Sequence, residues 1–472
     1  MDTALIITVE KSDAQQIVAP HERPSYQFDE GFVEWGGRIS LTRLEGADCA
    51  RRQHRPEPKR KTMRALLAAV GTRGDVQPAL ALAVELRKLG HSVRLCISPN
   101  FVEWAKSLGL EAVAMGVEMR MPARQSGAMP KLTPEELRRL RESMPDLITD
   151  QFKTIRTAAE GCDVIVGANA HQYAGPSIAE LIGIGCVTAV YAPVALPSPD
   201  LAPAPTPGEP IETTGSRSIL EQWRDVAKAW NERALERINR NRGCLGLGPI
   251  DDVLEYVLTD HTWLAADAAV AAVPTTPGRK IFQTGAWVLA DSAPLPSDLE
   301  AFLQHGEPPI FVGFGSMPAS SDAAHRVIAA ARAASRRIIV LKGWADLELM
   351  DDAPDCIAVG DVSYDILFPR VAAVVHHGGA GTTAAAARAG VPQIITPMFG
   401  DQFYWARRIV DLGAGATTPH ATMTEEFLTG ALREVCVPAV IDRARTLARQ
   451  IGQDGAKIAA RRLEVEYGAA KN

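Results

Sequence analysis

Two successive series of apolar strands, each strand followed by a helix, constrain the fold of this 472-residue chain more than any other feature. The first series opens with an apolar run at residues 66–70, which leads into a helix over about 76–89, and the second opens at 310–314. Strands that alternate with helices predict parallel, doubly wound sheets with helices on both faces. Further strands are expected at residues 91–97, 163–167 and 185–191 in the first series, and at 337–341, 356–359, 372–375 and 393–396 in the second.

The length of the chain also favours more than one domain, since a single core rarely grows beyond about 250–300 residues. A polar, Pro-containing stretch at 289–297 separates the two series and predicts a hinge. Further helices are expected over about 134–159, 219–240 and 438–467, and a Pro- and Ala-rich loop over 193–210. The predicted organisation is an N-terminal extension (1–62, poorly ordered or a non-native start), an acceptor-binding domain (63–288), a linker (289–308), a donor-binding domain (309–437) and a C-terminal helix (438–472) that docks on the surface.

Charge and cysteine content exclude several classes of protein. The net charge of -6 argues against a general nucleic-acid binder, which normally carries a basic surplus. Seven scattered cysteines without a C-x-x-C pair indicate neither a disulfide framework nor a zinc knuckle. No apolar run is long enough to span a membrane and no secretory signal opens the chain, so we expect a cytoplasmic protein without stable membrane insertion. Monomer and homodimer both remain open.

The most informative stretch is Val-His-His-Gly-Gly-Ala-Gly-Thr-Thr at 375–383, where a buried strand runs into a glycine-rich turn and an Ala-rich helix. Small residues let a ligand approach the backbone, and a helix N-terminus offers unpaired N–H groups with a partial positive charge. An anion, most plausibly a diphosphate, fits there without a metal, and His377 would add a hydrogen-bond donor. The alternative is a tight turn with two hydrogen-bonded structural histidines.

Two other segments of the second domain would lie on the same side of the cleft. Ser316, in the turn after the strand at 310–314, is expected either to bind a phosphate or to cap the next helix. Asp401 and Gln402 open a helix and suit hydrogen bonding to sugar hydroxyls, although Asp401 is also a plausible N-cap. The sequence argues against a nicotinamide-dependent enzyme, because neither domain has the G-x-G-x-x-G turn or a strand that ends in an acidic residue for the ribose.

The first-domain loop Gly-Thr-Arg-Gly-Asp-Val-Gln-Pro at 71–78 joins the first strand to the first helix. Asp75 stands at a predicted N-cap position, which is a sufficient structural role. Its functional interpretation is a general base that takes the proton of an attacking hydroxyl, which needs a positioned carboxylate or imidazole. Arg73 is expected to pair with Asp75 or to reach donor phosphates.

Together these motifs resemble the two-domain GT-B glycosyltransferases of vancomycin-type glycopeptide biosynthesis, and sterol glucosyltransferases share several of them. The segments that carry the resemblance, over about residues 63–472, are 71–78, 311–318, 375–383 and 401–402, with Trp-Leu-Ala-Ala-Asp at 263–267, Gln-Thr-Gly-Ala-Trp at 283–287 and Lys-Gly-Trp at 342–344. The resemblance implies two Rossmann-like domains and an inverting, metal-independent transfer from a nucleotide-diphosphate sugar. No metal-binding residue is expected and no cofactor beyond the donor, for which UDP-glucose is the expected identity.

The resemblance also implies roles for individual residues. Asp75 is implied as the base, Val362 as a contact to the nucleobase, and Asp401 with Gln402 as the sugar site. The implied diphosphate site consists of Thr72, Arg73, Ser316, His377, Gly379, Ala380, Gly381 and Thr382.

The expected function is transfer of a sugar to a hydroxyl of a hydrophobic natural product or antibiotic, in its biosynthesis or its inactivation. The acceptor would lie between residues 115–129, which contain four methionines, and the loop at 193–210. A sterol or lipid glucosyltransferase, a sugar-nucleotide epimerase of the same fold and a non-catalytic sugar-nucleotide binding module remain as alternatives.

Overall fold

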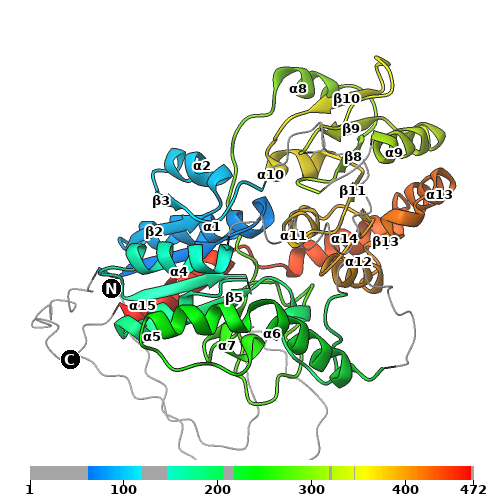
Figure 1. Ribbon diagram of the computed structural model, residues 1–472. Helices are drawn as coiled ribbons and strands as arrows, with labels where there is room; N and C mark the ends of the chain where they lie inside the picture. The colour runs from blue at the N-terminus through cyan, green and yellow to red at the C-terminus, as the bar shows by residue number, and fades with distance from the viewer. Residues whose placement is uncertain are drawn as a thin grey trace, which may run out of the picture. The chain divides into compact units, whose positions relative to one another are not determined.

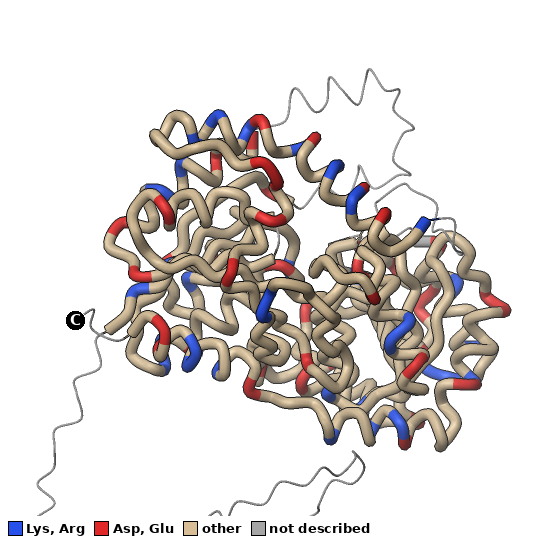
Figure 2. Tube along the Cα trace, turned by 90° about the horizontal axis from the view of Figure 1, so that it is seen from below, with Lys and Arg blue, Asp and Glu red and all other residues tan. Residues whose placement is uncertain are grey.

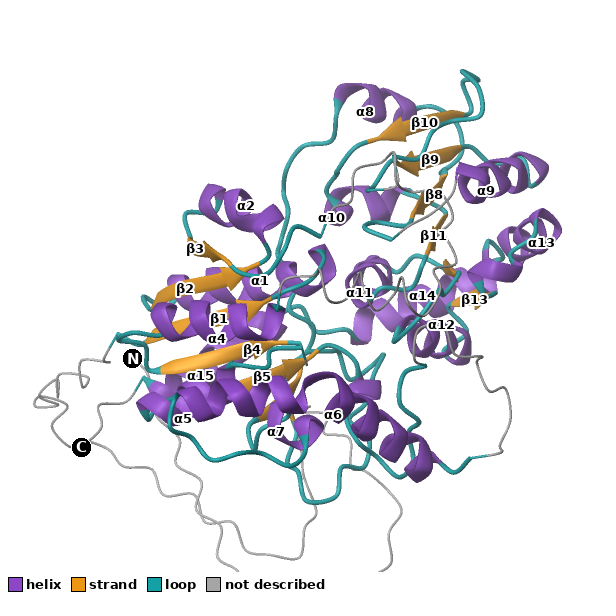
Figure 3. Cartoon of the chain, viewed as in Figure 1, coloured by secondary structure: helices purple, strands orange, loops and turns teal. Residues whose placement is uncertain are grey.

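The computed structural model describes residues 62–119, 146–169, 171–205, 217–317, 321–344 and 346–468 (Figures 1 and 3). The predicted N-terminal extension therefore lies outside the described residues except for its last position. Of the predicted acceptor segments 115–129 and 193–210, residues 120–129 and 206–210 lie outside them as well. The described part contains two parallel sheets, and each is considered in turn.

The first sheet has seven strands in the order β3-β2-β1-β4-β5-β6-β7, and every neighbouring pair is parallel. Strands β1, β2, β4 and β5 confirm the expected positions, whereas the short strands β3, β6 and β7 were not predicted. Their bounds are β1 (Arg64–Ala69), β2 (Ser92–Ile97), β3 (Glu111–Ala114), β4 (Val164–Ala168), β5 (Gly185–Val190), β6 (Thr262–Leu264) and β7 (Phe282–Gln283).

The second sheet has six parallel strands in the order β10-β9-β8-β11-β12-β13. All five expected strands are present, and β13 is an addition at the edge. Their bounds are β8 (Ile310–Gly313), β9 (Ile338–Leu341), β10 (Cys356–Val359), β11 (Ala373–His376), β12 (Gln393–Ile395) and β13 (Gly415–Thr417).

Helices connect the strands of both sheets (Figure 3). The long helix α6 agrees with the prediction for 219–240, whereas the expected linker contains a helix, α8. The α-helices of the described residues are α1 (Arg73–Lys88), α2 (Val102–Ser107), α4 (Leu147–Ala158), α5 (Gly175–Ile182), α6 (Ile219–Cys244), α7 (Val253–Val257), α8 (Ser297–Gln304), α9 (Ser321–Ala333), α10 (Tyr364–Leu367), α11 (Ala380–Ala389), α12 (Gln402–Asp411), α13 (Glu425–Val435), α14 (Pro438–Gln450) and α15 (Gly455–Tyr467).

Burial on both faces explains why the central strands are continuous apolar runs. Ala65, Leu67 and Ala69 of β1 belong to one hydrophobic cluster, and Leu66 and Ala68 belong to another. Successive side chains of a strand point to opposite faces, so β1 is covered by helices on both sides. This is the packing of a doubly wound sheet.

The C-terminal segment forms two helices in place of the single helix expected over 438–467. Helix α14 ends at Gln450, and α15 packs beside α1 in the core of the first sheet (Figure 1). Leu463 and Ala459 of α15 are fully buried there. The end of the chain therefore docks on the first sheet, as expected, but only after a break that lets the chain change direction.

The strand order places the carboxyl ends of particular strands next to a crevice. In each sheet the order reverses beside the first strand, between β1 and β4 in one and between β8 and β11 in the other. Ligands of doubly wound sheets bind at such switch points, outside the carboxyl ends of the strands. The loops after these four strands are therefore where a site is expected.

Two further properties bear on possible partners. None of the helices in the described ranges is long and apolar enough to cross a membrane. Basic and acidic positions are interspersed along the described trace (Figure 2).

The docking of α15 can be tested with a pair of residues on the same helix. Leu463 is fully buried and Val465 is 72% exposed. Leu463→Ala should lower the free energy of unfolding by about 2–5 kcal/mol, because it leaves a cavity in the core. Val465→Ala should change it by less than about 0.5 kcal/mol. Urea denaturation measures the free energy of unfolding of both variants. Equal losses in the two variants would mean that α15 does not pack against this core.

Candidate active site

The turn between β11 and α11 leaves the start of the helix open. Gly379 is the N-cap of α11, and since glycine has no side chain, no side chain caps the first turn. Ala380, Gly381 and Thr382 form that turn and are exposed or half-buried. Uncapped N–H groups at the start of a helix attract anions. The second sheet thus presents a row of uncapped backbone amides at its switch point, and such a row can accept an anion.

His377 packs directly against this turn as a neutral imidazole. Its side chain is buried, and burial lowers its pKa to about 3. A Cβ atom added at Gly379 would stand 2.6 Å from the Nε2 atom of His377, so only glycine fits between ring and turn. The Nδ1 atom of His377 has no hydrogen-bond partner among the described residues. A neutral imidazole carries one N–H, which leaves His377 able to donate to an anion.

His376 has the structural role that the sequence left open for both histidines. It is fully buried, and its Nδ1 accepts a hydrogen bond of 3.1 Å from the backbone N–H of Gly378. Its Nε2 therefore carries the proton and donates to Oε1 of Gln393 at 2.9 Å. Gly378 has a φ of +94°, which few residues other than glycine adopt. His376 holds this left-handed turn in place.

Asp75 lies at the switch point of the first sheet, within the first turn of α1. The N-cap of α1 is Thr72 rather than Asp75, and Asp75 completes a capping box by accepting a 2.7 Å bond from the Thr72 N–H. A Cβ at Gly71 would meet the Asp75 Oδ2 atom at 2.1 Å, so the carboxylate lies directly over that glycine. Burial raises the pKa of the Asp75 carboxyl above its ordinary value, although hydrogen bonds partly oppose this.

Arg73 forms an ion pair with a residue in a loop of the second sheet and not with Asp75. Its guanidinium lies 3.0 Å from the carboxylate of Asp361, in the loop after β10, and over the ring of Trp104. The predicted pairing with Asp75 is therefore wrong. Arg73 and Asp361 are far apart in the sequence, so only the fold shows that they pair.

Asp401 and Gln402 lie at the start of α12, as predicted. Asp401 is the N-cap, but its carboxylate accepts a 2.9 Å bond from the Trp405 indole instead of capping the helix. Burial, and then the nearby Asp75, raise the pKa of Asp401 to about 6. Gln402 is buried, and its carbonyl oxygen already accepts from the N–H of Met398 at 2.8 Å.

Ser316 and Val362 lie in loops at the same edge of the second sheet. Ser316 follows β8, and its neighbour Gly315 lies close to the His377 ring. Helix α9 begins only at Ser321, so Ser316 is not its N-cap. Val362 is half-buried in the loop between β10 and α10.

A narrow cavity lies between the start of α1 and the start of α11. Gly74 and Pro78 line it from the first sheet, and Ala380 and Gly381 line it from the second. The indole of Trp405, which binds Asp401, forms part of its wall. The influence of Asp75 on the pKa of Asp401 agrees with this proximity. The start of α1, which carries Asp75, and the open start of α11 thus line a common space.

One neighbour of Asp75 was not predicted from the sequence. Asn169, directly after β4, donates a 2.6 Å hydrogen bond to the Asp75 carboxylate. The signal was available, since β4 follows from the apolar run at 163–167 and a polar residue at its carboxyl end falls beside the loop after β1. The four methionines expected beside the acceptor are only partly described. Met115 is buried in the hydrophobic core, Met119 is half-buried, and Met121 and Met129 lie outside the described residues.

Comparison with known proteins agrees with this geometry. Residues 65–196 match the glycosyltransferase family 28 N-terminal domain, and residues 325–457 match the C-terminal domain of erythromycin biosynthesis protein CIII-like proteins. The chain is 43% identical over 403 residues to the vancomycin aglycone glucosyltransferase of Amycolatopsis orientalis, covering 85% of this chain and 97% of that protein. The chain belongs to the vancomycin-type glycosyltransferase family.

Other relatives of this glycosyltransferase support the same placement. The dTDP-epi-vancosaminyltransferase of Amycolatopsis orientalis is 38% identical over 394 residues, covering 82% of this chain and 93% of that protein. The crystal structure of glycosyltransferase VinC in complex with dTDP has a TM-score of 0.56 at 21% identity, covering 82% of this chain and 95% of VinC, which shows a shared fold. The fold is GT-B. The chain is a glycosyltransferase rather than the sugar-nucleotide epimerase or the non-catalytic binding module that the sequence left as alternatives.

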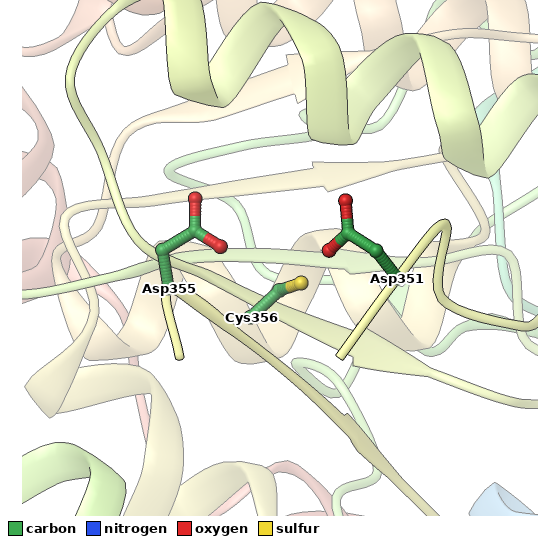
Figure 4. A group of neighbouring side chains, drawn as sticks. All are labelled: Asp351, Asp355 and Cys356. Atoms are coloured by element: carbon green, nitrogen blue, oxygen red, sulfur yellow. The ribbon is translucent and has the colours of Figure 1, made fainter. Parts of the chain in front are cut away.

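The described residues of this glycosyltransferase also contain a cluster of metal-ligand types, at the other end of the second sheet. Asp351, Asp355 and Cys356 point toward one another at the start of β10 (Figure 4). The guanidinium of Arg332 donates to both carboxylates, at 2.6–2.9 Å, and lowers the pKa of Asp351 to about 2. The Arg332 guanidinium already binds both carboxylates of this cluster, which lies at the amino end of β10, away from the start of α11.

The buried state of His376 predicts a specific pH dependence of stability. Its pKa is about 4 in the folded protein because of burial, against an ordinary 6.5. As the pH falls from about 6.5 to 4, the His376 ring takes up a proton in the unfolded chain but not in the folded protein, so the free energy of unfolding decreases over this pH range. His376→Asn removes this titration. Denaturation at a series of pH values should therefore show a shallower loss for the variant, and an unchanged slope would contradict the assignment.

Proposed function

We propose that this glycosyltransferase transfers glucose from UDP-glucose, with inversion, to a hydroxyl of a hydrophobic natural-product or antibiotic acceptor. One observation carries the proposal: the first turns of α1, the helix that carries Asp75, and the open start of α11 line one cavity from opposite domains. A base for the acceptor and an anion site for the leaving group are the two functions that such a displacement requires.

The transfer is a single displacement at the anomeric carbon. The Asp75 carboxylate takes the proton of the acceptor hydroxyl as its oxygen forms the new bond to that carbon. The bond from the carbon to the donor phosphate breaks, and its electron pair leaves with the nucleoside diphosphate. The amides of Ala380, Gly381 and Thr382 and the N–H of His377 bind the developing charge. Attack opposite the leaving group inverts the anomeric centre, and no metal is required.

The remaining donor contacts follow from the same placement. Thr72, Arg73 and Ser316 would extend the diphosphate site, and Val362 would contact the nucleobase. Asp401 would hold sugar hydroxyls through the carboxylate oxygen that Trp405 leaves available. Gln402 would join it only by exchanging its present bonds within the loop. The relative that is 43% identical to this chain is named a vancomycin aglycone glucosyltransferase, and this name supports glucose as the sugar.

The acceptor would lie against an aromatic surface of the first domain next to Asp75. The ring of His171, two residues after Asn169, stacks on Trp230 of α6 with centroids 5.2 Å apart. Tyr173 closes the group, with its hydroxyl 3.2 Å from the Nδ1 atom of His171. Exposed and half-buried rings favour an apolar acceptor.

A sterol is the second candidate acceptor, because one relative supports it. The chain is 30% identical over 413 residues to a sterol 3-beta-glucosyltransferase of Arabidopsis thaliana, covering 82% of this chain and 66% of that protein. A screen of nucleotide sugars against glycopeptide aglycones, polyketides, macrolactams and sterols, with products identified by mass, separates the acceptors and also identifies the donor.

Asp75→Asn should lower kcat/KM by about 10²–10⁴-fold, the usual contribution of a general base, because an amide does not accept the proton. Donor affinity, measured by calorimetry, should stay within a few-fold of the original. Asp442→Asn is the control, since Asp442 is an exposed acid on α14. Undiminished turnover of Asp75→Asn would reject Asp75 as the base.

Gly379→Ala should weaken donor binding by at least tenfold, because the added Cβ would lie 2.6 Å from the His377 ring and displace it or the turn. Gly430→Ala, in helix α13 with no atom within 4 Å of its Cβ, is the matched control and should bind the donor normally. Titration calorimetry with UDP and UDP-glucose measures both.

Two results would contradict the proposed leaving-group site. One is normal donor binding by Gly379→Ala. The other is activity that disappears with a chelator and returns with a divalent cation, since amides at a helix start would then not be sufficient to hold the diphosphate.

A further inference from the structure

The loop after β4 brings a second polar residue to the carboxyl end of the first sheet. Asn169 follows β4, and β4 pairs directly with β1, whose following loop carries Asp75. The two residues are far apart in sequence, yet the Asn169 amide nitrogen lies 2.6 Å from the Asp75 Oδ1 atom. The strand pairing at the switch point produces this contact.

The orientation of the Asn169 amide is determined by its other bond. Its carbonyl oxygen accepts a 2.9 Å hydrogen bond from the backbone N–H of His171. Its NH₂ group must therefore point the other way, towards Asp75. The backbone of Asn169 is left-handed, with a φ of +73°, which asparagine tolerates better than most residues. Asparagine thus suits both the backbone and the bond.

From this geometry we infer that Asn169 is a positioning residue that holds the Asp75 carboxylate in its ionised, proton-accepting orientation. The inference rests on the proposed role of Asp75 as the base. Thr72 binds the Oδ2 atom through its N–H at 2.7 Å and its hydroxyl at 3.2 Å, and Asn169 alone among the described side chains binds Oδ1. Without Asn169 the carboxylate would be anchored on one side only.

Several groups besides Asn169 influence the protonation of Asp75. Burial raises the pKa of Asp75, whereas the bonds from Thr72 and Asn169 lower it. His171, after β4, acts on the same carboxyl, and Asp75 in turn affects Tyr191, directly after β5, and Asp401, the N-cap of α12. Arg73 on α1 is turned to Asp361. The pKa of His171 is lowered by desolvation of its ring among the neighbouring side chains, and also by Arg233 of α6.

The test compares the pH profiles of kcat/KM for acceptor transfer in three proteins. Asn169→Gly keeps the left-handed backbone and removes only the side chain. We expect kcat to fall by at least about tenfold and the acid limb to move towards higher pH, because the ionised carboxylate loses a donor. The donor KM should change less than twofold. Asn169→Asp keeps the shape of the side chain but places an oxygen against the Asp75 carboxylate, so the acid limb should move further towards higher pH. If Asn169 had only a structural role, Asn169→Asp would restore the original profile.

The control is Ser335→Gly, which makes the same kind of change at another left-handed position, with a φ of +54°, outside the site. It should leave the profile unchanged. If Asp75→Asn is inactive but Asn169→Gly matches the original profile, the positioning role is overturned and the base stands. If Asp75→Asn is fully active, the base and the positioning role fail together. An acid limb that disappears in His171→Gln would belong to the imidazole and would also overturn the inference.

Discussion

The open amino end of α11 is the feature on which the rest of this structure depends. A helix start without a side-chain cap has unpaired N–H groups that need an anion or water. Gly379 contributes to this in two ways. It has no side chain to cap the helix, and it leaves room for the His377 ring. His376 and Gly378 hold the turn behind it. The protein thus keeps a row of amides free at the switch point of its second sheet.

The first sheet complements this site with negative charge. Asp75 serves the fold, since it completes the capping box of α1 and lies over Gly71, and it also influences Asp401 of the other domain. The same burial that raises the pKa of Asp75 and of Asp401 strengthens their electrostatic effect on a ligand. Separate domains carry the amides and the Asp75 carboxylate, so the carboxylate does not occupy the anion site itself.

Local sequence was sufficient for those features that depend on neighbours along the chain. Strands of the two sheet centres could be located because burial on both faces requires continuous apolar runs. Edge strands β3 and β13 could not, since they are short and only partly buried. The capping role of Asp75 was misplaced by three residues because the helix begins at Arg73 rather than Val76. The break between α14 and α15 depends on where the chain must turn to reach the first sheet.

By itself, the sequence determined the doubly wound class, the glycine-rich turn with its anion-binding helix start, and the acid after the first strand. Each of these is encoded in a few consecutive residues, through periodicity, small side chains and turn chemistry. Only the tertiary structure decided that Asn169 binds Asp75, that Arg73 pairs with Asp361, and that both ring nitrogens of His376 are used in hydrogen bonds within the protein. These contacts join residues that are distant along the chain or distinguish neighbours by their packing, and only the folded arrangement of the strands supplies that information.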